Sequence, residues 1–342
     1  MEDSLVSIVA LNWNGLGHLE TCLTSLCGQT YAPREVILMD NGSNDGSVEY
    51  TRTNFPEVRV VHLPENHGIG PGVNAGVAAA RGEFIALINN DTEADSGWVT
   101  EAVRALRDHP EAGFTASRMR LFARRTHLDG AGDLFFSTGY PGKRGWLMRD
   151  GPEFDGNAWV FGACAGAAVY RRSMIDEIGM FDESYYACFE DLDLSFRAQL
   201  MGYSCLYVGS SIIYHKLGST VGFSLSNPEQ AFRAHRNRWY TVIKNVPPAL
   251  LRRYLAQMVA AEAVVLASSA RRGRLKVLLR ARAAVVREMP RLRAKRRAIQ
   301  SRRKRSIEGL DAVIRKDWFA HRMAERRREI EDAAATRPNP RP

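Results

Sequence analysis

Residues 84–93 read FIALINNDTE, and this stretch decides which fold the sequence predicts. Its first five residues are apolar, as in a buried strand, and they lead directly into Asn89, Asn90 and Asp91. Asn and Asp are common turn formers, so the three side chains fit a plain polar turn. They also fit a metal or ligand site, because open α/β sheets bind ligands at the carboxyl ends of their strands. The rest of the chain has to decide between these two interpretations.

The sequence around this stretch alternates between strand and helix patterns. Apolar runs predict strands and spaced apolar residues predict helices, in the following ranges: strands 5–11, 35–40, 58–63 and 207–215, and helices 18–28, 72–81 and 98–108. In a later segment Leu192, Phe196 and Leu200 follow helical spacing. The alternation predicts βαβ units, and hence an α/β fold with a mostly parallel sheet. Residues 120–160 are Gly-rich without a clear period, which predicts an irregular loop region that covers a substrate.

The composition is ordinary for a globular protein, with 45% hydrophobic and 25% charged residues. A chain of 342 residues suffices for one large α/β domain with an appendage, or for two domains. The five cysteines are odd in number and lack any CxxC spacing. They predict reduced thiols in a cytosolic setting rather than disulfides or a zinc site. The first residues are acidic and enter a strand pattern at once, so we expect no signal peptide.

Charge divides the chain into two parts. Residues 251–342 contain 26 Lys and Arg against 9 Asp and Glu, a formal charge of +17, which leaves −8 for the preceding part. We therefore predict an α/β domain over residues 1–246, a basic amphipathic helical extension over 247–332 and a disordered tail over 333–342. Leucines and valines set among arginines favour an anionic membrane surface as the partner of the extension. A solvated helical extension or a coiled-coil partner face is the alternative.

Two further features of the extension bear on its partner. Its longest uncharged apolar run is too short to span a bilayer of about 30 Å. It has few aromatic residues and no recognisable nucleic-acid-reading motif, so we expect no nucleic acid partner. These features predict a cytoplasmic protein that is peripheral on the inner face of the cell membrane.

Polar side chains gather where the predicted strands and helices end. They form four groups: Asn12, Trp13 and Asn14; Asp40; Asn89, Asn90 and Asp91; and Glu190, Asp191 and Asp193, with His215 at the end of the last strand. Each group has a simple structural explanation, such as a loop cap at Asp40 or first-turn acids favoured by a helix dipole. Together they place carboxylates, amides and one histidine at the same edge of one inferred sheet, which favours a functional site.

Five motifs follow one another along the chain: VSIVALNWNG, VILMDNGSNDGS, ENHGIGPGVNAGVAAARGEFIALINNDT, FEDLDLSFRAQLMGY and YHKLGST. In order and spacing they resemble the inverting glycosyltransferases of family 2, over roughly residues 4–245. The resemblance is greatest to the bacterial branch that assembles cell-surface polysaccharides, which includes many rhamnosyltransferases. It implies the GT-A fold, a Rossmann-like, mostly parallel sheet flanked by helices, here with a basic helical C-terminal extension.

The resemblance also implies roles for residues of this chain. The nucleotide-sugar donor would be bound by the following residues: Leu11, Trp13, Asp40, Asn66, Asn74, Asn89 and Asn90. Trp13 stands where an aromatic residue often stacks on the base. Asp91 and His215 would bind a divalent metal, Mg²⁺ or Mn²⁺, that grips the diphosphate. Asp191 would be the catalytic base, with Glu190 beside it in the same acidic pair.

These roles imply an inverting glycosyltransferase of the hexosyltransferase type. It would move a sugar, with rhamnose as one candidate, from a nucleoside diphosphate sugar to a polyprenyl-linked or growing cell-surface glycan. A metal would act as Lewis acid on the diphosphate while a carboxylate takes the proton of the acceptor. Asn89 stands where the family usually has an acid, so weaker metal binding is expected.

Other classes of protein fit the sequence less well. A non-catalytic sugar-nucleotide-binding or scaffolding protein of the same fold is the main alternative, because a fold does not guarantee activity. A nucleic-acid binder acting through the basic tail is a more remote one. A nicotinamide dehydrogenase is not expected, because GIGPGVNAG has Val73 where the dinucleotide fingerprint requires its last glycine.

Overall fold

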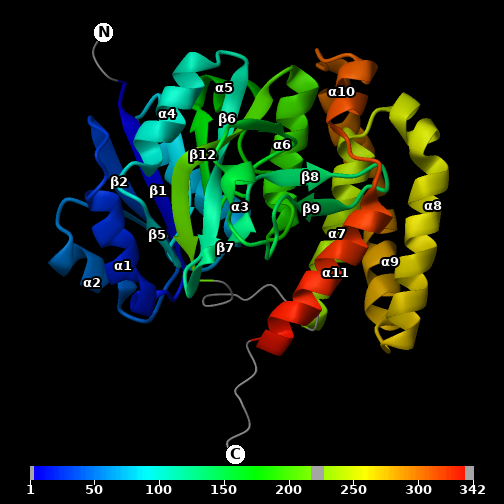
Figure 1. The fold of residues 1–342 in the computed structure, drawn as a ribbon, viewed down its shortest axis with the longest axis horizontal. Helices are drawn as coiled ribbons and strands as arrows, with labels where there is room; N and C mark the ends of the chain where they lie inside the picture. The colour runs from blue at the N-terminus through cyan, green and yellow to red at the C-terminus, as the bar shows by residue number, and fades with distance from the viewer. Residues whose placement is uncertain (1–3, 217–226, 336–342) are drawn as a thin grey trace, which may run out of the picture.

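The computed structural model describes residues 4–216 and 227–335, and its centre is a ten-stranded mixed sheet (Figure 1). The strands of the chain are β1 (Val6–Asn12), β2 (Arg34–Asn41), β3 (Arg59–Leu63), β4 (Phe84–Asn89), β5 (Thr92–Ala94), β6 (Ala112–Leu121), β7 (Arg124–Gly130), β8 (Asp133–Phe135), β9 (Pro141–Lys143), β10 (Ala158–Val160), β11 (Ala167–Arg171) and β12 (Ser204–His215). Their order in the sheet is β10, β12, β6, β11, β4, β1, β2 and β3. Strand β5 pairs with β12 and β7 with β6, while β8 and β9 form a separate hairpin.

The four strands predicted in the first hundred residues form one parallel half of this sheet. Strand β1 pairs in parallel with β2 and β4, and β2 pairs in parallel with β3. Asn12 lies opposite Asp40, and Leu11 lies opposite Asn89, so these strands end at a common edge. The predicted α/β fold with a mostly parallel sheet is confirmed.

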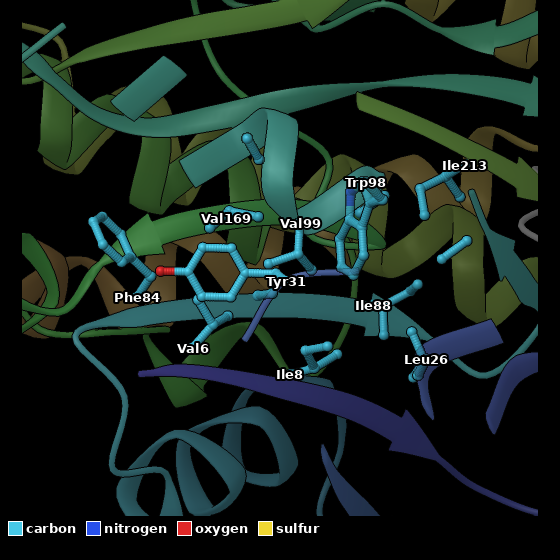
Figure 2. Close-up of a cluster of buried hydrophobic side chains, with 14 of the residues drawn as sticks. Val6, Ile8, Leu26, Tyr31, Phe84, Ile88, Trp98, Val99, Val169 and Ile213 are labelled. Carbon is cyan, nitrogen blue, oxygen red and sulfur yellow. The ribbon is translucent and has the colours of Figure 1, made fainter. Parts of the chain in front are cut away.

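Helices cover both faces of the sheet. Those between the strands are α1 (Leu16–Cys27), α2 (Ser47–Asn54), α3 (Ile69–Ala79), α4 (Trp98–Asp108), α5 (Arg172–Ile178) and α6 (Glu190–Met201), with short 3₁₀ turns η1 (Pro152–Phe154) and η2 (Glu183–Tyr185). Helices α1 and α4 pack against Val6, Ile8 and Ile88 on one face (Figure 2). Helices α3, α5 and α6 cover Val9 and Ile37 on the other. Strands that are buried on both faces are apolar throughout, which explains their unbroken apolar runs.

The interpretation of residues 120–160 as an irregular loop is wrong. Strand β6 continues to Leu121, and β7, β8, β9 and β10 follow within that range. In the hairpin, Asp133 pairs with Lys143. Strands β8, β9 and β10 have three residues each, too few for an alternating pattern to appear in the sequence.

The C-terminal helices pack on the hairpin and on α6. They are α7 (Pro228–Asn245), α8 (Pro248–Arg271), α9 (Leu275–Ser301), α10 (Ile307–Val313) and α11 (Trp318–Ala335). Leu250 of α8 and Ile314, which follows α10, share an apolar cluster with Phe135 of β8 and Phe196 of α6. The backbone N–H of Arg315 also donates to the carbonyl of Phe135 (2.9 Å). These contacts join the hairpin to a part of the chain about 180 residues away.

Parts of two predicted features lie outside the described residues. These are residues 217–220 of the YHKLGST motif and residues 336–342 of the predicted disordered tail. The first three residues of that tail, 333–335, belong to α11. None of the helices in the described ranges combines the length and the apolar character needed to cross a bilayer.

Candidate active site

Three buried polar side chains at the ends of β1, β2 and β4 bond to one another. Nδ2 of Asn12 donates to Oδ1 of Asp40 (2.8 Å), and Oδ1 of Asn12 accepts from Nδ2 of Asn90 (2.6 Å). The parallel registers of the three strands bring these residues together. Leu11, one residue before Asn12, packs against the apolar cluster under α3. We call Asn12, Asp40 and Asn90 the strand-end cluster.

Asp40 also fixes the loop that follows β2. Its carboxylate accepts from the backbone N–H (3.0 Å) and Oγ (2.5 Å) of Ser43, and it lies 2.8 Å from Nδ1 of His62 on β3. Ser43 in turn accepts from the backbone N–H of Asn14 (2.8 Å). The loops after β1 and β2 are thereby tied together, and Trp13, in the first of them, has a 37% exposed side chain.

The asparagines of the ENHGIGPGVNAG motif hold loops in place. Oδ1 of Asn66 accepts from Nδ2 of Asn41 (3.1 Å) and from the backbone N–H of Gly68 (2.8 Å). Both amide atoms of Asn74 bond to the backbone of Phe181, each at 3.0 Å. Donor binding by Asn66 and Asn74 stays a prediction, and these bonds give both residues a structural role as well.

Asp91 faces His215 at the end of β12. Nε2 of His215 lies 3.3 Å from Oδ1 of Asp91, and Nδ1 lies 3.0 Å from Oδ2 of Asp129 on β7. Burial alone would lower the pKa of His215, but the hydrogen bonds and charges of the two carboxylates outweigh it and raise that pKa to about 9. Asn89, at the end of β4, is half-buried. Across residues 4–216 and 227–335, no group of three or more His, Cys, Asp and Glu side chains is placed to hold a metal ion.

The β7 strand and the β8–β9 hairpin bring further charges to the site. Nζ of Lys143 lies 2.9 Å from Oδ1 of Asp129. Burial works to raise the pKa of Asp129, yet Lys143 and His215 hold it well below its usual range. Burial and the negative charge of Asp191 raise the pKa of Asp133 to about 7. We call Asp129, Asp133 and Lys143 the hairpin cluster.

Asp191 and Glu190 open α6, and their surroundings differ. The carboxylate of Asp191 accepts from the backbone N–H of Leu192 (2.8 Å) and of Ala165 (3.4 Å). Oε2 of Glu190 is buried and has no hydrogen-bond partner among the described residues. Burial raises the pKa of both carboxyls, and the charge of Asp191 helps to raise that of Glu190 to about 8. The two N–H donors favour the negative charge on Asp191, so Glu190 keeps the proton.

A strained turn leads into these two acids. Tyr186, Cys188 and Phe189 have φ angles of 63°, 73° and 70°, a left-handed conformation that is costly for residues other than glycine. Nδ2 of Asn237, on α7, lies within 3.0 Å of three backbone carbonyls of this turn. Asn237 therefore acts as a clamp that holds the turn, and through it the start of α6 with Asp191.

Asp193 does not join the other acids of its motif. It is fully buried, with Nζ of Lys244 at 2.8 Å and Nε of Arg197 at 3.0 Å. Lys244 lies on α7, so its ion pair with Asp193 links α6 to α7, which is a structural task. Of the other predicted residues, Asn12, Asp40 and Asn90 lie together at the ends of β1, β2 and β4, and Asp91 lies beside His215.

Sequence reasoning missed four residues of the site: Asp129, Asp133, Lys143 and Asn237. The first three lie on β7, β8 and β9, within the range that the sequence predicts to be an irregular loop. One signal was available, because the Gly-rich segment LDGAGD (128–133) carries two acids where β7 ends and β8 begins. Asn237 lies in an otherwise ordinary amphipathic helix, and no sequence pattern distinguishes it.

The mixed sheet, with carboxylates and amides at the ends of its parallel strands, has the GT-A fold of solved glycosyltransferases. The family described as Glycosyl transferase family 2 matches residues 7–179, about half of the chain. The chain belongs to this family and is a glycosyltransferase enzyme, as the motifs predict.

Two relatives show how far the sequence similarity extends. The N-acetylglucosaminyl-diphospho-decaprenol L-rhamnosyltransferase of Mycobacterium tuberculosis is 27% identical over 261 residues, which cover 69% of this chain and 83% of that protein. The putative glycosyltransferase EpsH of Bacillus subtilis is 28% identical over 233 residues, covering 64% of this chain and 62% of EpsH. The predicted similarity to rhamnosyltransferases is confirmed.

Two solved structures share the fold. GalNAc-T7 with UDP, GalNAc and Mn²⁺ matches with a TM-score of 0.59 at 16% identity, over 71% of this chain and 48% of that one. The mannosyltransferase PcManGT of Pyrobaculum calidifontis, in complex with GDP-Man and Mn²⁺, matches with a TM-score of 0.54 at 16% identity, over 88% and 85% of the two chains. The two TM-scores show a common fold, and at such low identities the similarity supports the fold alone. The GT-A prediction is confirmed.

Proposed function

We propose that this glycosyltransferase moves a sugar from a nucleoside diphosphate donor to a polyprenyl-linked acceptor or a growing cell-surface glycan, with inversion at the anomeric carbon. Rhamnose is the first sugar to test, because the mycobacterial relative is an L-rhamnosyltransferase whose name specifies a diphospho-decaprenol compound. The observation that carries the proposal is the pair at the start of α6. Asp191 is stabilised as the anion by two N–H donors, while its buried neighbour Glu190 keeps its proton.

Asp191 serves as the base in this mechanism. The acceptor hydroxyl gives its proton to Asp191 as its oxygen attacks the anomeric carbon, and the bond from that carbon to the diphosphate breaks on the opposite face. One displacement of this kind inverts the configuration, as in inverting glycosidases. Burial raises the pKa of Asp191 and makes it a better proton acceptor, while the positive charge of Lys143 helps to keep it ionised.

Asp91 and His215 suit a divalent metal, Mg²⁺ or Mn²⁺. Asp129 bonds to Nδ1 of His215, and Nε2 of the same ring points toward Asp91. Metal-binding histidines are commonly oriented in this way, by a carboxylate that bonds to the ring nitrogen not used for the metal. The two carboxylates already favour a positive charge at His215, and a metal would take the place of the proton there. Asn89 offers only a neutral amide oxygen. When bound, such an ion would neutralise charge on the departing diphosphate.

The donor side of the proposal rests on the strand ends. The exposed indole of Trp13 offers a flat surface for the base, with Leu11 just before it on β1. Asp40 is held rigidly by its hydrogen bonds, ready to contact the base or ribose. The remaining predicted donor contacts are the amides of Asn66, Asn74, Asn89 and Asn90.

The acceptor suggests where the enzyme works. A polyprenyl-linked acceptor lies in a membrane, so we place the enzyme on the inner face of the cell membrane, in the cytoplasm. The basic segment 247–332 would provide the peripheral attachment to anionic lipids. Nucleic acid has no part in the proposal.

The decisive test is Asp191→Asn in a transfer assay with a panel of sugar nucleotides, with Mg²⁺ and with Mn²⁺. Loss of the base should slow turnover by about 10²–10⁴-fold, while calorimetry should show donor binding close to that of the wild type. Asp176→Asn, at an exposed carboxylate of α5, is the matched control and should keep full activity. Full transfer by Asp191→Asn would remove Asp191 as the base, and binding without transfer to any acceptor would favour the non-catalytic alternative.

A further inference from the structure

The outer face of α8 is apolar along most of its length. Between residues 255 and 270 all nine exposed residues are Leu, Val or Ala. Leu255 and Val259 are each 60% exposed and Leu266 is 47% exposed. With Ala263 and Ala270 they recur every three or four residues, so they form one stripe about 22 Å long. We call these five residues the outer stripe of α8.

The opposite face of α8 is already used inside the protein. Leu250, Tyr254 and Met258 pack into the cluster shared with the hairpin. Glu262, the one acid between residues 248 and 271, forms ion pairs with Arg238 of α7 and Arg282 of α9. The outer stripe therefore lies on a side of the helix that does not contribute to the hydrophobic core and carries no acidic side chain.

Positive charges lie at both ends of the stripe. Arg252 is exposed at the start of α8, and Arg271 and Arg272 are exposed at its end. In Figure 1 α8 forms the edge of the molecule farthest from β2 and α2. An apolar stripe on an outer edge, bounded by arginines, combines the two features that bind a helix in the plane of an anionic membrane.

We propose that the outer stripe of α8 is the surface by which this protein docks on an anionic lipid bilayer, with the helix lying in the membrane plane. Leu255, Val259 and Leu266 enter the interface between headgroups and acyl chains, and the arginines at the two ends meet lipid phosphates. The inference rests on the membrane attachment in the proposed function and assigns it to one surface.

The sequence favours the leucines and valines set among arginines in the extension as the membrane contact, whereas the proposal places that contact on the outer stripe of α8. Val285 and Leu292 of α9 are buried against Tyr240 of α7, so part of the apolar side of α9 is already covered by protein. The exposed apolar residues of α9, such as Leu279 and Val286, stand among arginines rather than in an uninterrupted apolar face. The hydrophobic contact with the membrane is therefore assigned to α8.

Charge argues against a second copy of the chain as the occupant. In an antiparallel pairing of two α8 helices, Arg252 of one copy would meet Arg271 and Arg272 of the other. In a parallel pairing, each arginine would meet its own counterpart. Neither arrangement supplies an acid from the outer stripe, whereas a membrane with anionic lipids supplies negative charge at both ends.

The test uses the full chain, because deleting the C-terminal helices would expose the cluster that they share with Phe135 and Phe196. Co-sedimentation is measured with vesicles of phosphatidylcholine alone and of phosphatidylcholine with phosphatidylglycerol. Leu255→Glu combined with Val259→Glu should weaken binding to the mixed vesicles by about tenfold or more, since two inserted side chains become charged. Met323→Glu, at a 68% exposed apolar residue of α11, is the matched control and should bind like the wild type.

A second arm tests the charges. Arg252→Gln, Arg271→Gln and Arg272→Gln together should weaken binding to the mixed vesicles and reduce its salt dependence. If the double variant Leu255→Glu/Val259→Glu does not show the melting temperature of the wild type, the double variant Leu255→Ser/Val259→Ser is tested in its place. Vesicle binding by Leu255→Glu/Val259→Glu at wild-type strength would overturn the proposal. So would a wild-type dimer in light scattering that this variant converts to a monomer, because the stripe would then join two copies.

The vesicle-binding test of the docking surface can fail or succeed independently of the sugar-transfer test of the proposed function. Leu255 and Val259 are exposed on α8 and belong to neither cluster of the candidate active site, so their variants should keep donor binding and transfer to a soluble acceptor. Loss of vesicle binding with transfer intact supports the docking surface. A protein that binds vesicles through α8 but transfers no sugar would contradict the proposed function and leave the docking surface standing.

Discussion

The strand-end cluster and the hairpin cluster are built from different interactions. In the strand-end cluster, Asn12 uses both ends of its amide to bond Asp40 and Asn90 on the adjacent strands. In the hairpin cluster, Asp129 is balanced by Lys143 and His215, which come from β9 and β12. One cluster depends on strand register, while the other depends on charges that distant parts of the chain bring together.

This difference shows which changes should disturb which part of the site. The register of β1, β2 and β4 follows from long apolar strands within the first hundred residues, so the strand-end cluster should tolerate changes elsewhere. In the hairpin cluster, Asp133 lies on β8, whose Phe135 packs with Ile314 and accepts a hydrogen bond from the backbone N–H of Arg315. Perturbing the charges, the turn at α6 or the C-terminal helices should therefore affect the chemistry of transfer more than donor binding.

Apart from the loss of the base Asp191 itself, the largest effect is expected from Asp129→Asn. The substitution removes the carboxylate that positions His215 and neutralises Lys143, a type of change that typically costs 10–100-fold in activity at such sites. Turnover should fall by about 100-fold in a steady-state transfer assay. Asp176→Asn is again the control. If Asp129→Asn keeps its turnover, the hairpin cluster does not organise the site.

The next effect is expected from Asn237→Ala. Without the amide clamp, the strained turn at Tyr186, Cys188 and Phe189 should relax and shift Asp191 from its place. We expect turnover to fall by about tenfold, with donor affinity unchanged in calorimetry. Asn227→Ala removes the side-chain cap at the start of the same helix and serves as control. Equal kinetic losses in both variants would indicate that α7 matters as a whole and that the clamp has no special role.

A smaller effect on turnover is expected from Ile314→Ala. Ile314 is almost fully buried beside Phe135, so the variant should lose about 2–5 kcal/mol of unfolding free energy in a urea titration. Turnover should fall only a few-fold, because the hairpin becomes looser but keeps its charges. Ile330→Ala, at a 61% exposed position of α11, should change stability by less than about 0.5 kcal/mol. A destabilised Ile314→Ala with fully wild-type kinetics would show that the C-terminal helices do not support the site.

The same contrast explains what the sequence could and could not predict. Strands β1, β2 and β4 contain apolar runs that end in polar residues, so both their existence and the polar edge could be predicted from local pattern. Strands β8 and β9 are too short to show a period, and their position depends on contacts with residues such as Ile314. Lys143 and Asp129 therefore gave no local sign that they would meet.

The motif resemblance predicted more residues of the candidate site than the hydrophobic pattern did. It pointed to Asp91, Asp191 and His215, and the structure brings Asp91 and His215 to 3.3 Å. It named Asp191 as the base, with Glu190 beside it in the same acidic pair, but it gave no physical reason for that choice. Their hydrogen bonds separate them, and that distinction can be tested directly.

The smallest effect on turnover is expected from Glu190→Gln, which tests that distinction. If Glu190 is protonated below pH 8, a neutral amide of the same shape should reduce turnover by less than about twofold at pH 7, a loss far below that of a missing base.

The folded state raises the pKa of Glu190 from its ordinary value of 4.5 to about 8, so between these pH values it holds a proton that the unfolded chain releases. Wild-type stability should therefore fall as the pH rises across this window, and Glu190→Gln should reduce that fall. Urea titrations at several pH values, together with pH–rate profiles, measure both effects. A loss of turnover as large as that of Asp191→Asn would instead make Glu190 the base.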